Sequence, residues 1–169
     1  PNIDPVLFKL GFLEIRWYGL SYVLGLFLSF NFIKKPFLKL GVSEDQHANL
    51  MTYSILAVIL GGRLGYTLFY NFSYYIKNPV EILFVWQGGM SYHGAAIGLM
   101  LTFIFYAKSL NKNPLDFLDL LGLGAPIAVC LGRLANFING ELYGRVTDAP
   151  WGMIFPLGGP LPRHPSQLY

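Results

Sequence analysis

Four long apolar stretches restrict the folds that this chain can adopt. They cover residues 17–33, 50–70, 88–107 and 115–131. A helix needs about 17–25 mostly apolar residues to cross the hydrocarbon core of a bilayer. Because lipid cannot satisfy free peptide groups, such stretches cross a membrane as α-helices. We therefore predict an all-α, polytopic membrane protein with about four transmembrane helices, all within one transmembrane domain over residues 1–169.

The composition supports this class and excludes others. Hydrophobic residues make up 54% of the chain and charged residues 12%, whereas soluble domains carry about 25% charged residues. The net charge of +3 is too small to indicate nucleic acid as a partner, so the lipid bilayer is the expected environment. The single cysteine, Cys130, excludes an intrachain disulfide, and its apolar surroundings favour a packing role over a nucleophilic one.

Two shorter segments do not match a membrane span. Pro1–Arg16 mixes charged and apolar residues, and we expect it to lie on the bilayer surface. Ile82–Trp86 is apolar but too short to span, which indicates an interfacial or re-entrant piece. The chain opens without a methionine and stops directly after a dense motif, so we expect it to be part of a longer protein.

The lysines orient the predicted helices. The loop after the first apolar stretch carries Lys34, Lys35 and Lys39, and the loop after the third carries Lys108 and Lys112. The loop between the second and third stretches carries only Lys77. Lysine-rich loops stay on the cytoplasmic side of a membrane, so we predict that the N-terminus lies outside.

Two of the apolar stretches contain polar residues that need an explanation. The second contains GGRLGY, with Arg63 between glycines. Either the small residues pack helices while Arg63 reaches an interface, or Arg63 is a buried cation that faces a polar cavity, which we favour. The third stretch opens with GGMSYHG. Its His93 is as compatible with a structural role as with a functional one.

The segment Gly132–Arg145, GRLANFINGELYGR, is predicted to form an outer-face loop after the fourth stretch. It is called the signature stretch below. The guanidinium of Arg133 is a planar fork that matches a phosphate. An arginine at a helix end can also simply extend its charge to the interface. The nearby polar residues, Asn136, Asn139 and Glu141, favour the functional interpretation.

The predicted topology brings these candidates to one side of the membrane. Tyr18, Arg63, His93 and the signature stretch all fall at the outer ends of their helices. Residues far apart in sequence would therefore share one depth. We predict that they form a single site.

Five blocks of the chain, in order, resemble prolipoprotein diacylglyceryl transferases. They are WYG at Trp17–Gly19, GGRLGY at Gly61–Tyr66, GGMSYHG at Gly88–Gly94, the signature stretch, and RHPSQLY at Arg163–Tyr169. That family has about seven spans, so the resemblance implies that the later spans lie outside this sequence. It also implies a multi-pass protein of the bacterial inner membrane with its active site toward the periplasm.

The resemblance implies a transferase that acts in the first step of lipoprotein maturation. Its partners would be phosphatidylglycerol and a prolipoprotein signal peptide with a lipobox cysteine. The diacylglyceryl group would pass to the cysteine thiol, which forms a thioether and releases glycerol phosphate. The family's functional positions fall on Tyr18, His93, Arg133, Asn136, Glu141 and Gly144.

The residue types allow roles to be assigned for such a reaction. A thiolate is the reactive form of cysteine, and an imidazole such as that of His93 suits a general base. Arg133 would hold the phosphate as charge develops on it. Further headgroup contacts are assigned to Arg63, Asn136, Asn139, Glu141 and Tyr18, with a backbone-shape role for Gly144. No metal or cofactor is expected.

Two other classes of function remain open at this point. Arg63 and Arg133 would also suit the pathway of a membrane anion channel or carrier. A non-catalytic scaffold would use the same glycines and arginines to pack helices. Neither class predicts glycerol phosphate release that depends on a cysteine peptide.

Overall fold

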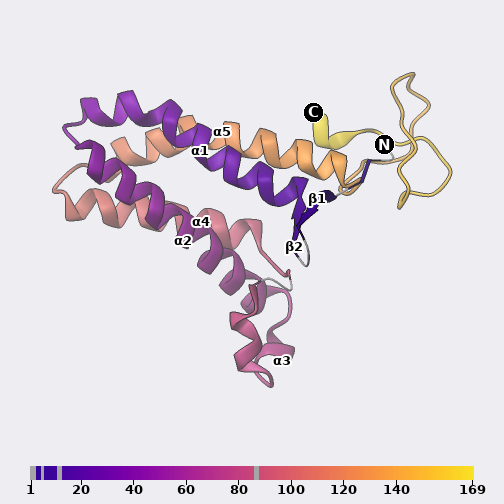
Figure 1. Cartoon of the computed structure of the whole chain (residues 1–169), viewed down its shortest axis with the longest axis horizontal. Coiled ribbons are helices and arrows are strands. Elements are labelled where there is room, and N and C mark those ends of the chain that lie inside the picture. The colour runs from indigo at the N-terminus through magenta and orange to yellow at the C-terminus, as the bar shows by residue number, and fades with distance from the viewer. Residues whose placement is uncertain (1–2, 5, 11–12, 86–87) are drawn as a thin grey trace. The chain divides into compact units, whose positions relative to one another are not determined.

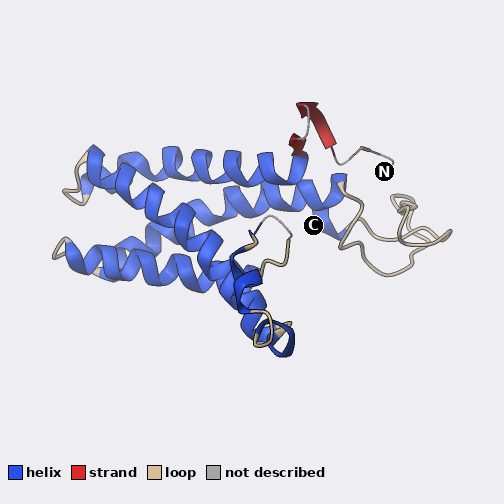
Figure 2. Ribbon diagram, turned by 60° about the horizontal axis from the view of Figure 1, so that its bottom comes forward, coloured by secondary structure: helices blue, strands red, loops and turns tan. Residues whose placement is uncertain are grey.

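The computed structural model of the chain describes residues 3–4, 6–10, 13–85 and 88–169. Helices dominate it, and Figure 2 shows the short strands in red near the N-terminus. In chain order the elements are β1 (Val6–Leu10), β2 (Leu13–Arg16), α1 (Trp17–Lys39), α2 (Glu44–Phe69), α3 (Phe72–Tyr75), the 3₁₀ helix η1 (Pro79–Leu83), α4 (Tyr92–Ser109), α5 (Pro114–Ile138) and the 3₁₀ helix η3 (Ser166–Leu168). Figure 1 labels the strands and α-helices.

The chain forms two compact units. The first contains residues 1–32 and 124–169, and the second contains residues 33–123. The boundary passes through α1 after Phe32 and through α5 after Leu123. The candidate residues are divided between the units, and each unit is described by itself below.

The second unit is built around close contact between α2 and α4. A Cβ added to Gly61 would lie 2.5 Å from Gly94 O, and one added to Gly65 would lie 2.7 Å from Gly94 Cα. A Cβ on Gly98 would lie 2.7 Å from Ala57 O. Only glycine lets two helix backbones approach so closely. Small-residue packing, the interpretation of GGRLGY that we favoured less, is therefore present.

Local sequence signals explain where α2 and α4 begin. Ser43 caps α2, and a capping box joins it to Gln46. Ser91 caps α4 by accepting a hydrogen bond from Gly94 N at 3.1 Å. Residues 88–91 therefore precede the third helix, which the apolar pattern had started at Gly88. Ser91 N also donates to Gly62 O at 2.8 Å, which fastens the start of α4 to α2.

In the first unit, α1 packs closely on α5. A Cβ on Gly25 would lie 3.0 Å from Ala128 Cα, and Ser29 Oγ donates to Gly124 O at 2.9 Å. The chain then continues from α5 into an irregular segment that ends at η3, drawn in tan and with the C-terminus marked in Figure 2. Phe155, fully buried, anchors this segment.

The signature stretch is helical over its first half, which corrects the prediction of a loop over residues 132–145. Helix α5 continues to Ile138. It ends where Gly140 adopts φ +68°, with Gly140 N bonded to Phe137 O and Glu141 N bonded to Asn136 O. This pair of bonds around a left-handed residue is a Schellman motif. The prediction placed the polar run after the helix, but Arg, Leu and Ala are good helix formers.

The expectation of an all-α protein is wrong at the N-terminus. Strands β1 and β2 pair antiparallel, with Phe8 opposite Ile15 and Lys9 opposite Glu14. Both segments are short, and Leu13–Arg16 alternates apolar and charged residues, which is a strand pattern. Strands of five and four residues are too short to be recognised among long apolar helices.

Long helices lie at all four predicted apolar stretches. Within the part of the chain that the structure describes, α2 and α5 are long and apolar enough to cross a membrane. Helix α1 extends beyond the predicted end at Ile33 and runs through Pro36 to Lys39. Trp86, the last residue of the predicted interfacial piece, and Gln87 after it lie outside the described residues.

Candidate functional site

The side chain of Arg133 is bound to the C-terminal segment of the first unit. Its Nε donates to Gln167 O at 3.2 Å, and its second terminal nitrogen donates to Ser166 O. The residue is half-buried. A guanidinium carries five N–H groups, so three of them have no acceptor among the described residues. The arginine is thus held in place while its remaining N–H groups stay available to another acceptor.

The carboxylate of Glu141 gathers the two asparagines of the signature stretch. Its Oε1 accepts from Asn136 Nδ2 at 2.9 Å and from Asn139 Nδ2 at 3.2 Å. The Schellman motif explains this arrangement, because it turns Glu141 back over the last turn of α5. Asn136 is buried, whereas Asn139 and Glu141 are half-buried.

Gln167 links these two groups and was not singled out from the sequence. Its side-chain Nε2 donates to Glu141 O at 2.5 Å, and its backbone carbonyl accepts a hydrogen bond from Arg133. Gln167 is only 2% exposed. It lies in the RHPSQLY block, and the resemblance of that block to a known family was the sequence signal that could have identified Gln167. We call Arg133, Asn136, Asn139, Glu141 and Gln167 the Arg133 cluster.

Gly144 lies where a side chain would collide with the C-terminal segment. Its N donates to His164 O at 2.8 Å, and an added Cβ would lie 3.0 Å from His164 Cβ. Arg163 supports the same region: its guanidinium lies over the Tyr143 ring at 5.2 Å, and its Nε donates to Gly158 O at 2.8 Å. The geometry thus gives Gly144 a backbone-shape role.

Tyr18 forms a pair with Tyr22 near the start of α1. The two hydroxyl oxygens are 3.1 Å apart, and the ring centroids are 4.9 Å apart. Tyr22 also approaches α5, because its hydroxyl would lie 3.9 Å from a Cβ on Gly132. Both rings are partly exposed. Sequence reasoning selected Tyr18 and missed Tyr22, which lies one helical turn further along.

Arg63, in the second unit, is buried and bound by backbone carbonyls. It is 3% exposed. Its guanidinium donates to the backbone oxygens of Glu81, Ile82, Gly88 and Gly89. It also lies over the Tyr75 ring at 5.1 Å from the centroid. Arg63 thus fastens these four backbone oxygens to α2, and all three of its guanidinium nitrogens donate hydrogen bonds.

The same segment holds a carboxylate that interacts with a tyrosine. Tyr74 Oη donates to Glu81 Oε2 at 2.7 Å. This hydrogen bond to a carboxylate, with smaller contributions from desolvation and nearby charge, raises the pKa of Tyr74 above its ordinary value of 10.0. Tyr74 therefore stays neutral and keeps donating at physiological pH.

His93 lies in the first turn of α4 and is exposed. Its ring stands edge-on to Tyr92, with centroids 5.7 Å apart. Arg63, on α2, binds the backbone carbonyls of Gly88 and Gly89, which lie a few residues before His93. These hydrogen bonds hold the start of α4 next to α2 and thereby help to position His93. His93 and Arg133 belong to different units, and their convergence on one site stays a prediction.

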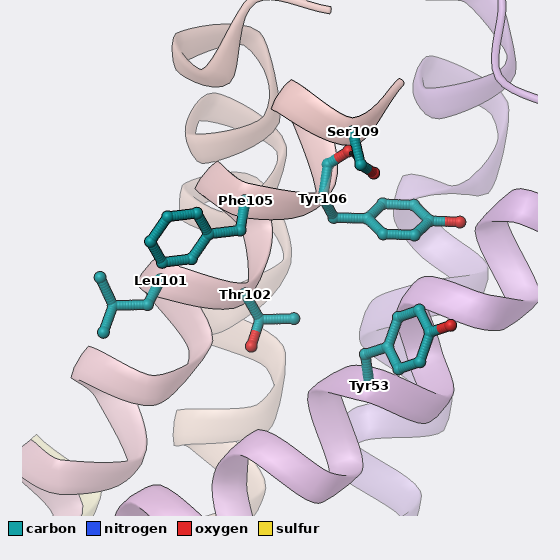
Figure 3. A pocket seen from close by; sticks show the side chains of 6 residues that line it. All are labelled: Tyr53, Leu101, Thr102, Phe105, Tyr106 and Ser109. Carbon is teal, nitrogen blue, oxygen red and sulfur yellow. Dashed lines mark hydrogen bonds between the residues drawn. The ribbon is translucent and has the colours of Figure 1, made fainter. Parts of the chain in front are cut away.

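A shallow pocket of about 390 Å³ lies between α2 and the second half of α4. Figure 3 shows its lining, which is Tyr53, Leu101, Thr102, Phe105, Tyr106 and Ser109. The Tyr106 hydroxyl donates to Gln46 O at 2.8 Å. None of the sequence-predicted site residues lines this pocket, so it does not mark the candidate site. Among the described residues, no group of three His, Cys, Asp or Glu side chains is arranged to hold a metal ion.

Comparison with known proteins identifies the chain's family. The family model described as prolipoprotein diacylglyceryl transferase matches residues 5–169. A relative from Geobacter sulfurreducens is 50% identical over 100% of this chain and 66% of its own length. Relatives from Desulfotalea psychrophila and Aliivibrio salmonicida are 51% and 47% identical over 100% of this chain and 63% and 60% of theirs.

All three relatives carry the name phosphatidylglycerol–prolipoprotein diacylglyceryl transferase. The chain therefore spans 60–66% of the length of these relatives. The match extends over every block that the sequence analysis singled out. This chain belongs to the prolipoprotein diacylglyceryl transferase family.

Proposed function

We propose that the protein containing this chain transfers the diacylglyceryl group of phosphatidylglycerol to the lipobox cysteine of a prolipoprotein. The observation that carries the proposal is the Arg133 cluster, in a chain that matches this family throughout. A partly free guanidinium beside a carboxylate and two amides suits a ligand with a phosphate and hydroxyl groups.

The reaction forms one C–S bond and breaks one C–O bond, and the thiol gives up its proton. The cysteine sulfur attacks the glyceryl carbon that bears the phosphate, which forms a thioether as the C–O bond breaks. The leaving group departs as glycerol phosphate with the electron pair of that bond. Arg133 stabilises the charge that develops on the leaving oxygen. His93 accepts the thiol proton, which makes the nucleophilic thiolate.

The proposed topology follows from the lysine distribution and the helix pattern. Helices α1, α2, α4 and α5 would each cross the inner membrane, with the N-terminus and the site on the periplasmic side. The chain would be part of a longer, multi-pass protein, as its relatives' lengths suggest.

The anion-carrier alternative is less favoured. It needs Arg63 to line a pathway, but four backbone carbonyls already accept its N–H groups. An arginine so engaged suits a structural clamp better than a moving anion. Anion flux into proteoliposomes without transfer to a peptide would restore the carrier.

The experiment uses the full natural protein in detergent with phosphatidylglycerol and a lipobox peptide. Transfer adds the mass of one diacylglyceryl group to the peptide and releases one glycerol phosphate. A peptide with Ser in place of Cys controls for the nucleophile. An unmodified cysteine peptide, with protein that is folded and lipid that is present, would overturn the proposal.

A further inference from the structure

Two buried side-chain oxygens in the Arg133 cluster accept no hydrogen bond from the described residues. They are Asn139 Oδ1 and Gln167 Oε1, and each has almost no accessible surface. An unpaired buried acceptor is costly, and native proteins keep few of them. Both belong to side chains that donate hydrogen bonds to Glu141, so the two unpaired acceptors lie within one small hydrogen-bond network.

The orientation of each amide follows from its neighbours. Asn139 Nδ2 donates to the Glu141 carboxylate, and Gln167 Nε2 donates to Glu141 O. Carboxylate and carbonyl oxygens only accept. Exchanging N and O in either amide would therefore place two acceptors against each other. The network itself leaves the two oxygens as the unpaired atoms.

These oxygens can be paired only by a hydrogen-bond donor. The non-ester oxygens of a phosphodiester carry no hydrogen and cannot pair with them. A hydroxyl group can. The adjacent Arg133 fork, in contrast, needs an anionic acceptor. The cluster therefore combines a phosphate-binding half and a hydroxyl-binding half.

We propose that Asn139 and Gln167 bind the two free hydroxyls of the headgroup glycerol while Arg133 binds its phosphate. Gln167 becomes a substrate-binding residue that determines specificity for a lipid with a hydroxylated headgroup. This inference rests on the proposed function. It also requires the half-buried Asn139 and Glu141 side chains to move when a hydroxyl enters, because both acceptors are closed to solvent.

The test compares phosphatidylglycerol with lipids that lack one headgroup hydroxyl. Phosphatidyl-1,3-propanediol lacks the secondary hydroxyl, and phosphatidyl-1,2-propanediol lacks the primary one. One neutral hydrogen bond corresponds to about a tenfold change in kcat/KM. We expect each analogue to react about tenfold more slowly than phosphatidylglycerol with the unaltered full-length protein.

Two variants assign the hydroxyls. Gln167→Met and Asn139→Leu each remove one acceptor at similar volume, and each should abolish the tenfold preference against one analogue while keeping it against the other. Asn31→Leu, on the exposed side of α1, is the control and should keep both preferences. Folding of each variant is checked by its thermal unfolding in detergent.

The outcomes separate this inference from the proposed function. If a variant slows all three lipids by the same factor, Gln167 and Asn139 are only structural and the inference fails. If the unaltered protein does not discriminate among the lipids, the inference fails while the transferase stands. If no lipid supports transfer to the peptide, the proposed function fails first.

Discussion

At the scale of single residues, Arg133 is the side chain whose geometry matters most to the proposed chemistry. Two backbone carbonyls orient its guanidinium, and three of its five N–H groups have no acceptor among the described residues. A lysine keeps the charge but cannot present two parallel N–H groups. We expect Arg133→Lys to lower the transfer rate by about 100-fold, as loss of a charge-stabilising donor does.

The measurement for Arg133→Lys is the rate of peptide modification at saturating lipid. Arg145→Lys is the matched control, because Arg145 is exposed and lies in the same signature stretch. A lysine variant with near-normal turnover would remove the phosphate-binding role from Arg133.

His93 is the proposed proton acceptor. His93→Gln preserves size and some hydrogen bonding but cannot accept the thiol proton. We expect that variant to modify the peptide about 100-fold more slowly than the unaltered protein. Turnover equal to that of the unaltered protein would make the histidine structural.

Arg63 is a charged residue in an apolar stretch, and its hydrogen bonds go to backbone carbonyls of the same chain. Lysine has three donors from one nitrogen and cannot reach four carbonyls on two segments. We expect Arg63→Lys to destabilise the second unit by about 2–4 kcal/mol, since it leaves buried carbonyls unpaired. Thermal unfolding in detergent measures the loss. An unfolding temperature equal to that of the unaltered protein would contradict the clamp.

At the scale of elements, the contact of α2 with α4 depends on glycines rather than on large apolar side chains. A Cβ on Gly94 would lie 2.9 Å from Gly65 Cα and even closer to Gly61 O, and backbone atoms cannot move aside as a side-chain end can. We expect Gly94→Ala to destabilise the helix pair by about 1–3 kcal/mol.

Gly122→Ala is the control for that change. Gly122 lies in α5, and a Cβ there would meet nothing within 4 Å. Alanine favours a helix over glycine, so this variant should be as stable as the unaltered protein or more so. If the Gly94→Ala and Gly122→Ala variants were equally stable, α2 and α4 could accommodate the added Cβ with no loss of stability, which would contradict the prediction.

At the scale of the whole molecule, the orientation in the membrane can be tested through the loops. In a Cys130→Ala background, Lys77→Cys would lie outside the cell and Lys112→Cys inside, if the lysine-rich loops are cytoplasmic. We expect a membrane-impermeant maleimide to label only the first in intact spheroplasts. Labelling of Lys112→Cys alone would reverse the predicted topology.

Much of the fold was predictable because helix formation in an apolar stretch depends on local residues. Helices occur at all four predicted places, and Ser43 and Ser91 are recognisable caps. The hairpin at Val6–Arg16 was missed because its strands are too short to stand out. The end of α5 was placed too early because polarity was taken as a loop signal, although Gly140 is the true stop.

Residue types and the family resemblance pointed to Arg133, Asn136, Asn139 and Glu141 as candidates, and their functional roles stay predictions. The structure bonds both asparagines to Glu141 directly and links Arg133 to Glu141 through Gln167. Gln167 and Tyr22 were missed. Each acts through a contact with a residue distant in sequence, and no local pattern signals such a contact.

The sequence alone determined the four helical stretches and the family. These depend on the length of the apolar stretches and on the motifs, both of which can be read along the chain without its three-dimensional contacts. Only the tertiary structure decided that Arg63 binds four carbonyls while Arg133 keeps free donors. The two arginines look alike in sequence, and their difference arises because a hydrogen bond depends on which distant backbone atoms the fold brings within reach.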